Sequence, residues 1–328
     1  KSYSFCTLLE KMRSLIFASC VAAVATAAGT DYTTLFTEFK VKHGRTYATE
    51  AEEAKRFGYF VDNMKIADAY TKLNPKATFG VNAFADYSAA EFKTYHSGNA
   101  HFEATTKARG AEVFMSAEEK KVAAGEKIDW RTKGAVTHVK NQGQCGSCWS
   151  FSTTGGIEGQ WMLAGNTLTS LSEQELVSCD TIDQGCQGGI MQNAFKWLME
   201  NKDGKIVTES SYPYVSGMGS VPSCNCCSSR TFGAQITGHV DVTKTETAMA
   251  AWLYKNGPLS IAVDATQWQT YTGGIMTDCS AGQIDHGVLA VGFDDNHSPP
   301  YWIIKNSWAA SWGEEGYIRV EKGTDQCH

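Results

Sequence analysis

The sequence lacks several features that would assign its class directly. The apolar run Leu15–Val24 is too short to span a membrane, since a membrane helix needs about 20 apolar residues. No internal repeat is evident, and 20% charged with 42% apolar residues is ordinary for a globular chain, so disorder is not indicated. Cys145 and Cys148 form a C-x-x-C, a spacing that zinc sites also use, but we expect neither a zinc site nor another metal here.

Charge is too weakly biased to suggest nucleic-acid binding. The 328 residues carry a net charge of −6, and a chain of this length suggests two units or a domain with an attached segment. Residues 1–123 hold 16 Lys and Arg against 14 Asp and Glu, whereas residues 124–328 hold 13 against 21. Opposite net charges on two parts of one chain fit an intramolecular complex that weakens as carboxylates become protonated.

The N-terminal region contains a secretory-type signal that begins late. From Met12, a basic residue precedes the apolar run Leu15–Val24 and the small-residue pattern Ala25–Ala27, so we interpret residues 12–28 as a signal peptide. Residues 1–11 lack an initiator methionine, and we interpret them as translated upstream sequence. Secretory entry implies oxidising conditions, under which the eleven cysteines would form disulfides.

The stretch after the signal predicts helices, one strand and a linker. Residues 33–73 have helical periodicity, and Glu52 and Arg56 fall at the spacing of an i,i+4 ion pair. Gly80–Asp86 alternates polar and apolar residues, which predicts one short strand. Residues 97–126 are poor in large apolar side chains, so they predict an extended linker open to proteolysis.

The remaining chain changes from helical to strand signals. Patterns between Ser147 and Leu198 are mostly helical, and Ser172 with Glu175 predicts a capping box. Beyond Ala234 one helix, Met249–Tyr254, interrupts a series of predicted strands: Leu259–Val263, Val288–Phe293, Tyr301–Ile304 and Tyr317–Val320. A helical half followed by a β half predicts an α+β domain with two lobes.

Asn141–Ser152 contains the candidate nucleophile. Cys148 lies between a glycine-bearing turn and an apolar run with helical spacing, and a thiol at a helix start is favoured as the thiolate that attacks carbonyl carbon. Gln142 could donate to a developing oxyanion together with the backbone N–H of Cys148. Cys145 and Cys148 could instead form a redox pair, which remains an alternative at this point.

A thiol nucleophile needs a base and a group that orients the base. Four histidines lie beyond residue 126 and before the terminal His328: His138, His239, His286 and His297. His286 is the best candidate, because Asp285-His286-Gly287 opens an apolar strand that would hold the imidazole. Asn306 follows another apolar strand, and Trp308 and Trp312 could shield the pair from water.

These motifs resemble the papain-family, cathepsin L-like cysteine proteases, most of all those of trypanosomes and related kinetoplastids, from about Leu35 to Cys327. The stretches that carry the resemblance are Asp129–Arg131, Gln142–Ser150, Gly185–Gly189, Asp285–Val288, Asn306–Trp308 and Trp312–Tyr317. Residues 52–63 and Gly80–Asp86 resemble the family's inhibitory propeptide, although Ala67 and Thr71 depart from its usual pattern.

The resemblance implies a fold and an activity. We expect a papain-like α+β fold of a helical lobe and a β-barrel-like lobe with the active-site cleft between them, preceded by a mostly helical inhibitory prodomain. It implies a prodomain with linker at 29–123 and a catalytic domain at 124–328 that is incomplete at its C-terminus. The expected protein is a monomeric zymogen of a thiol endopeptidase without cofactor, in a lysosome-like compartment or secreted, that acts on proteins and peptides and is inhibited by its own prodomain.

The resemblance also assigns residues. It implies the catalytic set Cys148, His286 and Asn306 with Gln142 in the oxyanion hole, and it implies substrate contacts from Gly188, Gly189, Ile190, Met191, Ala262, Ile284 and Trp308. It implies the disulfides Cys145–Cys186, Cys179–Cys224 and Cys279–Cys327. Cys226 and Cys227 are then surplus and could pair together, stay reduced or compete with Cys224. A non-catalytic homologue remains the other alternative, although it would normally have lost one of the catalytic residues.

Overall fold

The computed structural model of the chain describes residues 30–96, 111–225, 229–279 and 282–327. The predicted upstream segment and signal peptide therefore lie outside the described residues, as do Cys226 and Cys227. The chain divides into a unit that ends at Thr46 and a larger unit from Tyr47 onward. Among the described residues, no helix has the length and apolar character needed to cross a membrane.

The smaller unit contains helix α2, Tyr32–His43. Asp31 caps its start, because the side chain accepts hydrogen bonds from the backbone of Thr33 and Thr34. Gly44 ends the helix in the left-handed conformation that glycine adopts without strain. This glycine explains why the helical periodicity of residues 33–73 produces two helices rather than one.

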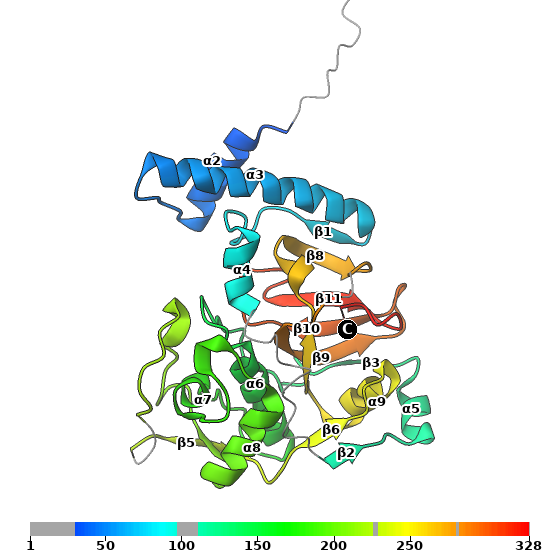
Figure 1. The fold of residues 1–328 in the computed structure, drawn as a ribbon. Helices are drawn as coiled ribbons and strands as arrows, with labels where there is room; N and C mark the ends of the chain where they lie inside the picture. Colours follow the sequence, from blue (N-terminus) through cyan, green and yellow to red (C-terminus); the bar gives the residue numbers. More distant parts are fainter. Residues whose placement is uncertain (1–29, 97–110, 226–228, 280–281, 328) are drawn as a thin grey trace, which may run out of the picture. The chain divides into compact units, whose positions relative to one another are not determined.

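The larger unit begins with the long helix α3, Glu50–Leu73, whose N-terminus is capped by Thr49. The predicted i,i+4 pair is present, with Arg56 Nε 2.7 Å from Glu52 Oε1. Strand β1, Ala77–Phe79, follows α3 and adds an edge strand to the main sheet by pairing antiparallel with β8, Tyr271–Met276 (Figure 1).

The predicted strand at Gly80–Asp86 is wrong. The chain turns there, because the Asn82 side chain forms a local hydrogen bond. Its Oδ1 accepts from the backbone N–H of Phe84 at 2.9 Å. The Asn82 amide also donates to the carbonyl oxygens of Gln269 (2.7 Å) and Tyr271 (3.2 Å), which ties the turn to the main sheet. Helix α4, Ala89–His96, follows this turn.

The linker prediction for residues 97–126 is also wrong where the structure describes it. Strand β2, Ala111–Val113, pairs parallel with β6, Val240–Val242, and helix α5 covers Ala117–Ala123. A complete capping box between Ser116 and Glu119 starts α5, and Lys255 Nζ lies 2.5 Å from Glu119 Oε1. The capping box of α5, its ion pair with Lys255 and the pairing of β2 with β6 therefore give regular structure to a segment whose composition alone predicts a linker.

The helical lobe contains three main helices around a buried apolar core (Figure 1). The elements of this lobe are α6 (Cys148–Leu163), α7 (Glu173–Cys179), η1 (Gly185–Gln187), α8 (Met191–Asn201), β4 (Lys205–Val207), η2 (Ser216–Met218) and β5 (Phe232–Gln235). Ser172 caps α7 by accepting from Glu175 N–H, as predicted, whereas the Glu175 side chain turns away to accept from Val207 N–H.

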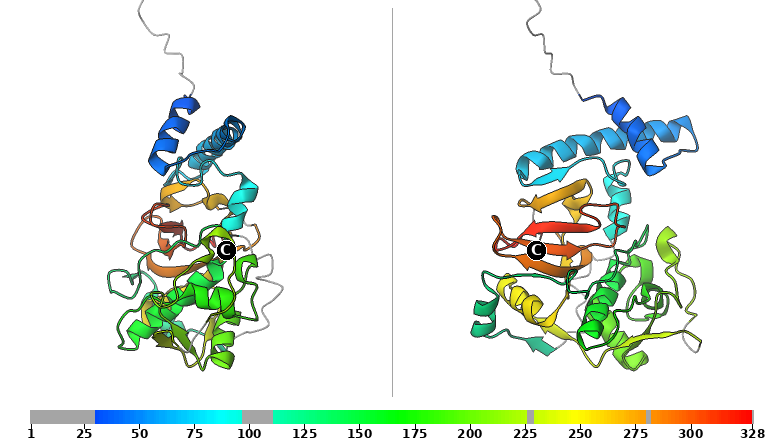
Figure 2. Two further views of the ribbon diagram at one scale, coloured as in Figure 1. Left: turned by 90° about the vertical axis from the view of Figure 1, so that its left-hand side faces the viewer. Right: turned by 180° about the vertical axis from the view of Figure 1, so that it is seen from behind.

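The second lobe is a seven-stranded sheet in the order β1-β8-β11-β10-β9-β3, with β7 also paired to β9. Its further elements are β3 (Lys127–Asp129), α9 (Glu246–Asn256), β7 (Leu259–Val263), η3 (Thr266–Trp268), β9 (His286–Asp294), β10 (Tyr301–Lys305) and β11 (Tyr317–Glu321). The prediction of an α+β domain with two lobes is confirmed. In both views of Figure 2 the helices α6, α7 and α8 lie next to this sheet.

Candidate active site

Cys148 is the first residue of helix α6 and is completely buried. The first N–H groups of a helix have no partner within the helix and carry the positive end of its dipole, so this position stabilises a negatively charged sulfur. Among the described cysteines, Cys148 stands outside the disulfides. The predicted nucleophile therefore keeps a thiol at the position that favours the thiolate.

His286 begins strand β9 and is held by two neighbours. Its Nε2 lies 2.8 Å from Asn306 Oδ1, and its ring stacks on Trp308 with 4.8 Å between centroids and 28° between planes. Trp268 meets the imidazole edge-on at 6.2 Å. These contacts fix both the position and the tilt of a ring that would otherwise rotate about two side-chain bonds.

The packing of α6 along β9 brings the thiol and the imidazole to the same end of the two elements. A Cβ added to Gly287 would lie 3.3 Å from the backbone nitrogen of Trp149, so the two backbones touch there. One turn further on, Ser152 Oγ donates to the carbonyl oxygen of Val288 at 2.7 Å. Cys148 and His286 each directly precede the touching residues, Trp149 and Gly287.

Gln142 is buried beside this junction. Its Oε1 accepts from Ser307 Oγ at 2.6 Å, and its Nε2 donates to Cys145 O at 3.0 Å. Its backbone N–H donates to Ser307 O at 2.9 Å. The side chain that the sequence assigns to the oxyanion is thus fixed by hydrogen bonds at both its oxygen and its nitrogen.

The residues expected to contact substrate backbone lie in a tight loop before α8. A Cβ on Gly189 would come within 2.6 Å of the Trp149 side chain and 2.7 Å of Asp183 Cγ, so only glycine fits there. Gly188 has a φ of 121°, which also favours glycine. The loop therefore presents bare backbone close to the start of α6.

The expected apolar pocket draws residues from both lobes. Ile190 and Met191 belong to the core cluster of the helical lobe, and Ala262 on β7 and Ile284 pack partly buried against this same cluster. Met191 also approaches the start of β9, since its sulfur would lie 3.2 Å from a Cβ at Gly287. The four side chains that the resemblance assigns to one pocket therefore share one apolar cluster.

The segment expected to be the prodomain contacts Trp308, whose ring stacks on His286. Phe84 and Phe92 meet the ring of Trp308 edge-on, at 5.6 Å and 5.1 Å between centroids. Gln269 Nε2 donates to the carbonyl oxygens of Phe84 and Tyr87, each at 3.1 Å. The prodomain turn is thus anchored on the tryptophan that supports the candidate base.

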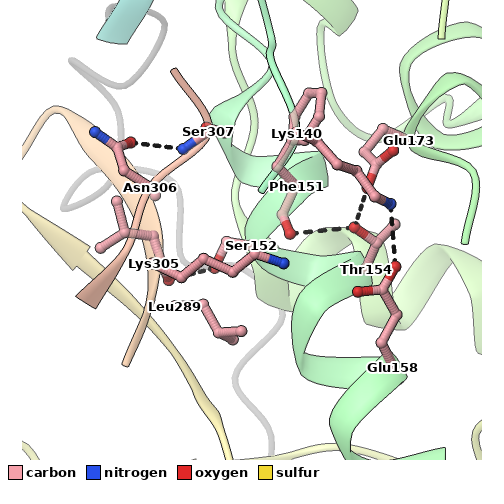
Figure 3. A pocket seen from close by; sticks show the side chains of 12 residues that line it. Lys140, Phe151, Ser152, Thr154, Glu158, Glu173, Leu289, Lys305, Asn306 and Ser307 are labelled. Atoms are coloured by element: carbon pink, nitrogen blue, oxygen red, sulfur yellow. Dashed lines mark hydrogen bonds and ion pairs between the residues drawn. The ribbon is translucent and has the colours of Figure 1, made fainter. Parts of the chain in front are cut away.

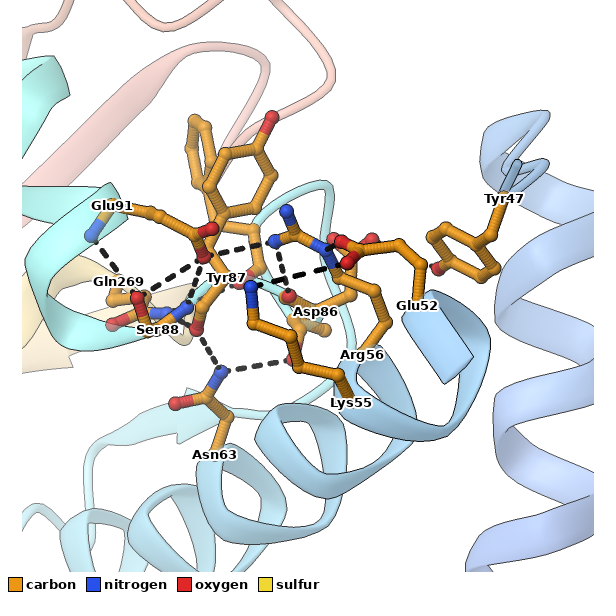
Figure 4. Close-up of polar contacts among 12 residues, drawn as sticks. Tyr47, Glu52, Lys55, Arg56, Asn63, Asp86, Tyr87, Ser88, Glu91 and Gln269 are labelled. Carbon is orange, nitrogen blue, oxygen red and sulfur yellow. Dashed lines mark hydrogen bonds and ion pairs between the residues drawn. The ribbon is translucent and has the colours of Figure 1, made fainter. Parts of the chain in front are cut away.

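A network of polar side chains holds this prodomain turn in shape (Figure 4). Arg56 on α3 bonds Glu52, the Asp86 carbonyl oxygen at 3.1 Å and Glu91 Oε2 at 2.8 Å. Burial raises the pKa of Glu91, but hydrogen bonds from Ser88 and Arg56 outweigh it, and the pKa is lowered overall. Ionised Glu91 therefore stabilises the folded protein at pH values above the pKa that this group has in the unfolded chain. The stabilisation is lost as the pH falls through its lower pKa in the folded protein.

Sequence reasoning missed a buried group of four charged side chains behind the site (Figure 3). Lys140 Nζ lies 2.6 Å from Glu173 Oε1 and 3.0 Å from Glu158 Oε1. Thr137 Oγ1 donates to Glu158 at 2.6 Å and accepts from Lys305 Nζ at 3.0 Å. These four charged residues, Lys140, Glu158, Glu173 and Lys305, are called the four-charge cluster below.

The four-charge cluster links the two lobes, because Glu158 and Glu173 lie on α6 and α7 whereas Lys305 lies on β10. The pocket that it lines also includes Asn306, but neither Cys148 nor His286. Burial lowers the pKa of Lys305 to about 8, although Glu158 opposes the shift. Burial also disfavours charge on Lys140, but the carboxylates Glu173 and Glu158 outweigh it and raise its pKa above the ordinary value.

The described cysteines form the pairs Cys145–Cys186, Cys179–Cys224 and Cys279–Cys327, which are the pairs that the resemblance implies. The redox alternative requires Cys145 and Cys148 to cycle together, and the Cys145–Cys186 bond removes that partner. Across the described ranges, no group of three or more His, Cys, Asp or Glu side chains is placed to hold a metal ion.

Comparison with known families and proteins agrees with this geometry. Residues 124–328 match the papain family cysteine protease model, and residues 36–92 match the cathepsin propeptide inhibitor domain. The chain is 52% identical over 317 residues to a cysteine proteinase of Trypanosoma brucei brucei, covering 95% of this chain and 69% of that protein. It is 49% identical over 313 residues to cysteine proteinase B of Leishmania mexicana, covering 95% and 71%.

Solved zymogen structures share the fold. The structure of the digestive procathepsin L2 proteinase from Tenebrio molitor larval midgut is similar with a TM-score of 0.80 and 30% identity, covering 90% of this chain and 96% of that chain. Procathepsin L 3 of the same larval midgut is similar with a TM-score of 0.75 and 35% identity, covering 91% and 96%. The chain therefore belongs to the papain family of cysteine proteases, as a proteinase preceded by its inhibitor-type propeptide.

Proposed function

We propose that the chain is the zymogen of an endopeptidase that works through a Cys148 thiolate paired with a His286 imidazolium. The thiolate attacks the carbonyl carbon of a peptide bond, His286 protonates the leaving amine, and water then hydrolyses the thioester. The observation that supports the proposal is the contact between the start of α6 and the start of β9, the two elements that begin with Cys148 and His286, together with the hydrogen bond from His286 to Asn306.

Asn306 determines which ring nitrogen exchanges protons with the thiol. The backbone N–H of Ser307 donates to Asn306 Oδ1 at 2.8 Å, which identifies Oδ1 as the acceptor and therefore His286 Nε2 as a donor. Nδ1 is then the ring atom that takes the proton of Cys148 and delivers it to the leaving amine. Trp308 limits rotation of the ring during this transfer.

The oxyanion is held by the backbone N–H of Cys148 and by the side-chain amide of Gln142. Both donors are fixed before substrate binds, one by the helix start and the other by Ser307 and Cys145. Preorganised donors of this kind contribute about 3 kcal/mol each to lowering the barrier.

Substrate lies along the loop before α8. Gly188 and Gly189 pair with its backbone, and the apolar pocket of Ile190, Met191, Ala262 and Ile284 takes the side chain of the second residue before the scissile bond. Trp308 forms the wall on the opposite side of the bond. The bare glycine backbone and the shared apolar cluster support this assignment.

The prodomain inhibits the enzyme in cis until the pH falls. Its anchoring on Trp308 through Phe84 and Phe92 supports the inhibition. Protonation of Glu91 removes one of the two anionic partners of Arg56, the other being Glu52, and loosens the turn that carries these rings. We infer that the enzyme works in an acidic, lysosome-like compartment reached through the secretory pathway, which also suits its disulfides.

The test is to express the zymogen, acidify it and follow peptidase activity while titrating with a thiol-directed irreversible inhibitor. We expect activity to appear only after acidification and to fall in proportion to an adduct on Cys148, located by mass spectrometry. Cys148→Ser should fold, as judged by circular dichroism, yet lose turnover. Peptide cleavage by this variant, or an adduct on another cysteine that tracks the activity, would overturn the assignment.

A further inference from the structure

Two aspartates lie beside the loop that the proposed function assigns to substrate. Asp180 follows the last residue of α7 and is buried, and its Oδ1 accepts from the backbone N–H groups of Ile182 (2.7 Å) and Asp183 (3.3 Å). Its neighbour Cys179 is fixed by a disulfide to Cys224. Asp180 is therefore held in place on the backbone of the turn that carries Asp183.

Asp183 contacts the substrate loop directly. Its Oδ1 accepts from the backbone N–H of Ile190 at 3.1 Å and from Asn193 Nδ2 at 3.0 Å. Its Cγ would lie 2.7 Å from a Cβ on Gly189, so the carboxyl group packs against this part of the loop backbone. The position of Gly189 and Ile190 thus depends on where the Asp183 carboxyl group is held.

The remaining oxygen of each carboxyl group, Oδ2, lacks a hydrogen-bond donor in the part of the chain that the structure describes. Asp180 Oδ2 and Asp183 Oδ2 are both buried and receive no hydrogen bond from another group among the described residues. The two carboxyl groups act on each other, and because two carboxylates are acceptors only, a hydrogen bond between them requires one shared proton.

No cation compensates this pair within the described part of the chain, since neither carboxyl group forms an ion pair there. The elements packed around it contribute neutral groups: the amide of Asn193 from α8, the indole of Trp149 from α6 and the Cys179–Cys224 disulfide beside α7. The charge that acts on each carboxyl group is therefore that of its partner.

Burial raises the pKa of Asp180 to about 8, and repulsion from Asp183 adds to the shift. Burial raises the pKa of Asp183 to about 6. Both folded values lie above the ordinary carboxyl value near 4, so the folded loop retains a proton that the unfolded chain releases. The stabilisation is therefore complete at acidic pH and decreases as the pH rises from about 4 through about 8.

We propose that Asp180 and Asp183 are positioning residues for the peptidase: while they share a proton they hold the Gly189–Ile190 backbone in place for substrate, and at higher pH the loop loosens. The proposal rests on the proposed function, which assigns this loop to substrate. It makes the substrate site itself sensitive to pH, separately from the thiol, the imidazole and the release of the prodomain.

The first test uses Asp180→Asn, whose amide N–H can donate to Asp183 at every pH. In the acid-activated enzyme we expect KM for a peptide substrate to rise about three- to tenfold from pH 5.5 to 8.5, because one pKa unit corresponds to a tenfold change in an equilibrium. In Asp180→Asn the rise should stay under about twofold. The pH profile of kcat should be the same in both proteins, since Cys148 and His286 are unchanged.

Two variants control this test. Asp203→Asn removes a carboxylate that is exposed and paired with Lys205, and it should leave the pH dependence of KM as in the parent enzyme. Asp183→Ala removes the acceptor of the Ile190 N–H and should raise KM at every pH, with a smaller change in kcat. Equal KM profiles for Asp180→Asn and the parent enzyme would overturn the proposal while leaving the peptidase assignment intact.

A second readout does not depend on activity. In the full chain carrying Cys148→Ser, hydrogen exchange of the Ile190 amide is compared at each pH with and without Asp180→Asn, so that intrinsic exchange rates cancel. We expect the ratio of protection to grow at least about threefold in favour of Asp180→Asn between pH 5.5 and 8.5. A constant ratio would contradict the proposal whatever the peptidase assays give, and Asp183→Asn offers the same comparison if Asp180→Asn does not fold.

Discussion

The two lobes hold their halves of the active site in different ways. Cys148 needs little help from side chains, because its sulfur is one bond from a Cβ that the first turn of α6 places directly. His286 carries its ring at the end of a rotatable side chain, and it depends on the Asn306 hydrogen bond and on contacts with Trp308 and Trp268. A nucleophile can be positioned by backbone, whereas a base has to be positioned by its neighbours.

The largest effect is expected from the four-charge cluster, which lies where the two lobes meet. Lys140→Met leaves Glu158 and Glu173 buried without their shared cation, and breaking a buried pair costs about 3–5 kcal/mol of folding free energy. We expect a loss of this size for the full chain carrying Cys148→Ser, measured by denaturant unfolding.

Matched variants sharpen this prediction. Lys305→Met should cost less, because burial already disfavours the charge of Lys305 and lowers its pKa to about 8. Lys205→Met removes an exposed ion pair with Asp203 and should cost under about 1 kcal/mol. A loss below about 1 kcal/mol for Lys140→Met would show that the four-charge cluster contributes little to the stability of the protein.

The next largest effect is expected on the side of the base. Asn306→Ala removes the hydrogen bond to His286 Nε2, and a hydrogen bond to a charged group contributes about 1.5–3 kcal/mol, so kcat should fall about 10- to 100-fold with a smaller change in KM. Trp308→Phe keeps an aromatic ring against the imidazole and should lower kcat less. If both variants kept the parent kcat, His286 would not depend on these neighbours.

The smallest effect is expected on the side of the nucleophile. Tyr214 donates to the carbonyl oxygen of Gln142 at 2.8 Å and lies 2.7 Å from Ser147 Oγ, so it supports the backbone on both sides of the Cys145–Cys186 disulfide. Tyr214→Phe should lower kcat by under about tenfold, because one neutral hydrogen bond contributes about 1 kcal/mol. A larger loss than that of Asn306→Ala would reverse the contrast between the two lobes.

Local patterns were enough to predict much of the fold. The helix that starts at Cys148 and the strands β7, β9, β10 and β11 follow from spacing, and Asp285-His286-Gly287 was recognisable at the start of its strand. Strand β8 was not predicted, because Gly273 and Gly274 interrupt its side-chain alternation. The capping signal of α5, Ser116 with Glu119, was present in the sequence but was outweighed by the composition of the segment around it.

The polar groups behind the site could not be predicted from local pattern. Lys140 and Glu173 are 33 positions apart, and Thr137 and Lys305 are 168 apart, so only the fold makes them neighbours. Asp180 and Asp183 are close in sequence, but their spacing alone is typical of an exposed acidic loop. Their effect depends on burial and on the absence of a nearby cation, which the tertiary structure determines.

Strand β1 has a consequence for the enzyme after activation. In the zymogen it covers one side of β8, with Ala77 opposite Gly274 and Thr78 opposite Gly273. Departure of the prodomain would uncover the backbone N–H and C=O groups of β8, and an uncovered strand is a template for association with other chains. The same two glycines and the irregular register beside them leave only a short regular stretch for such pairing, so this edge is a poor template even when it is uncovered.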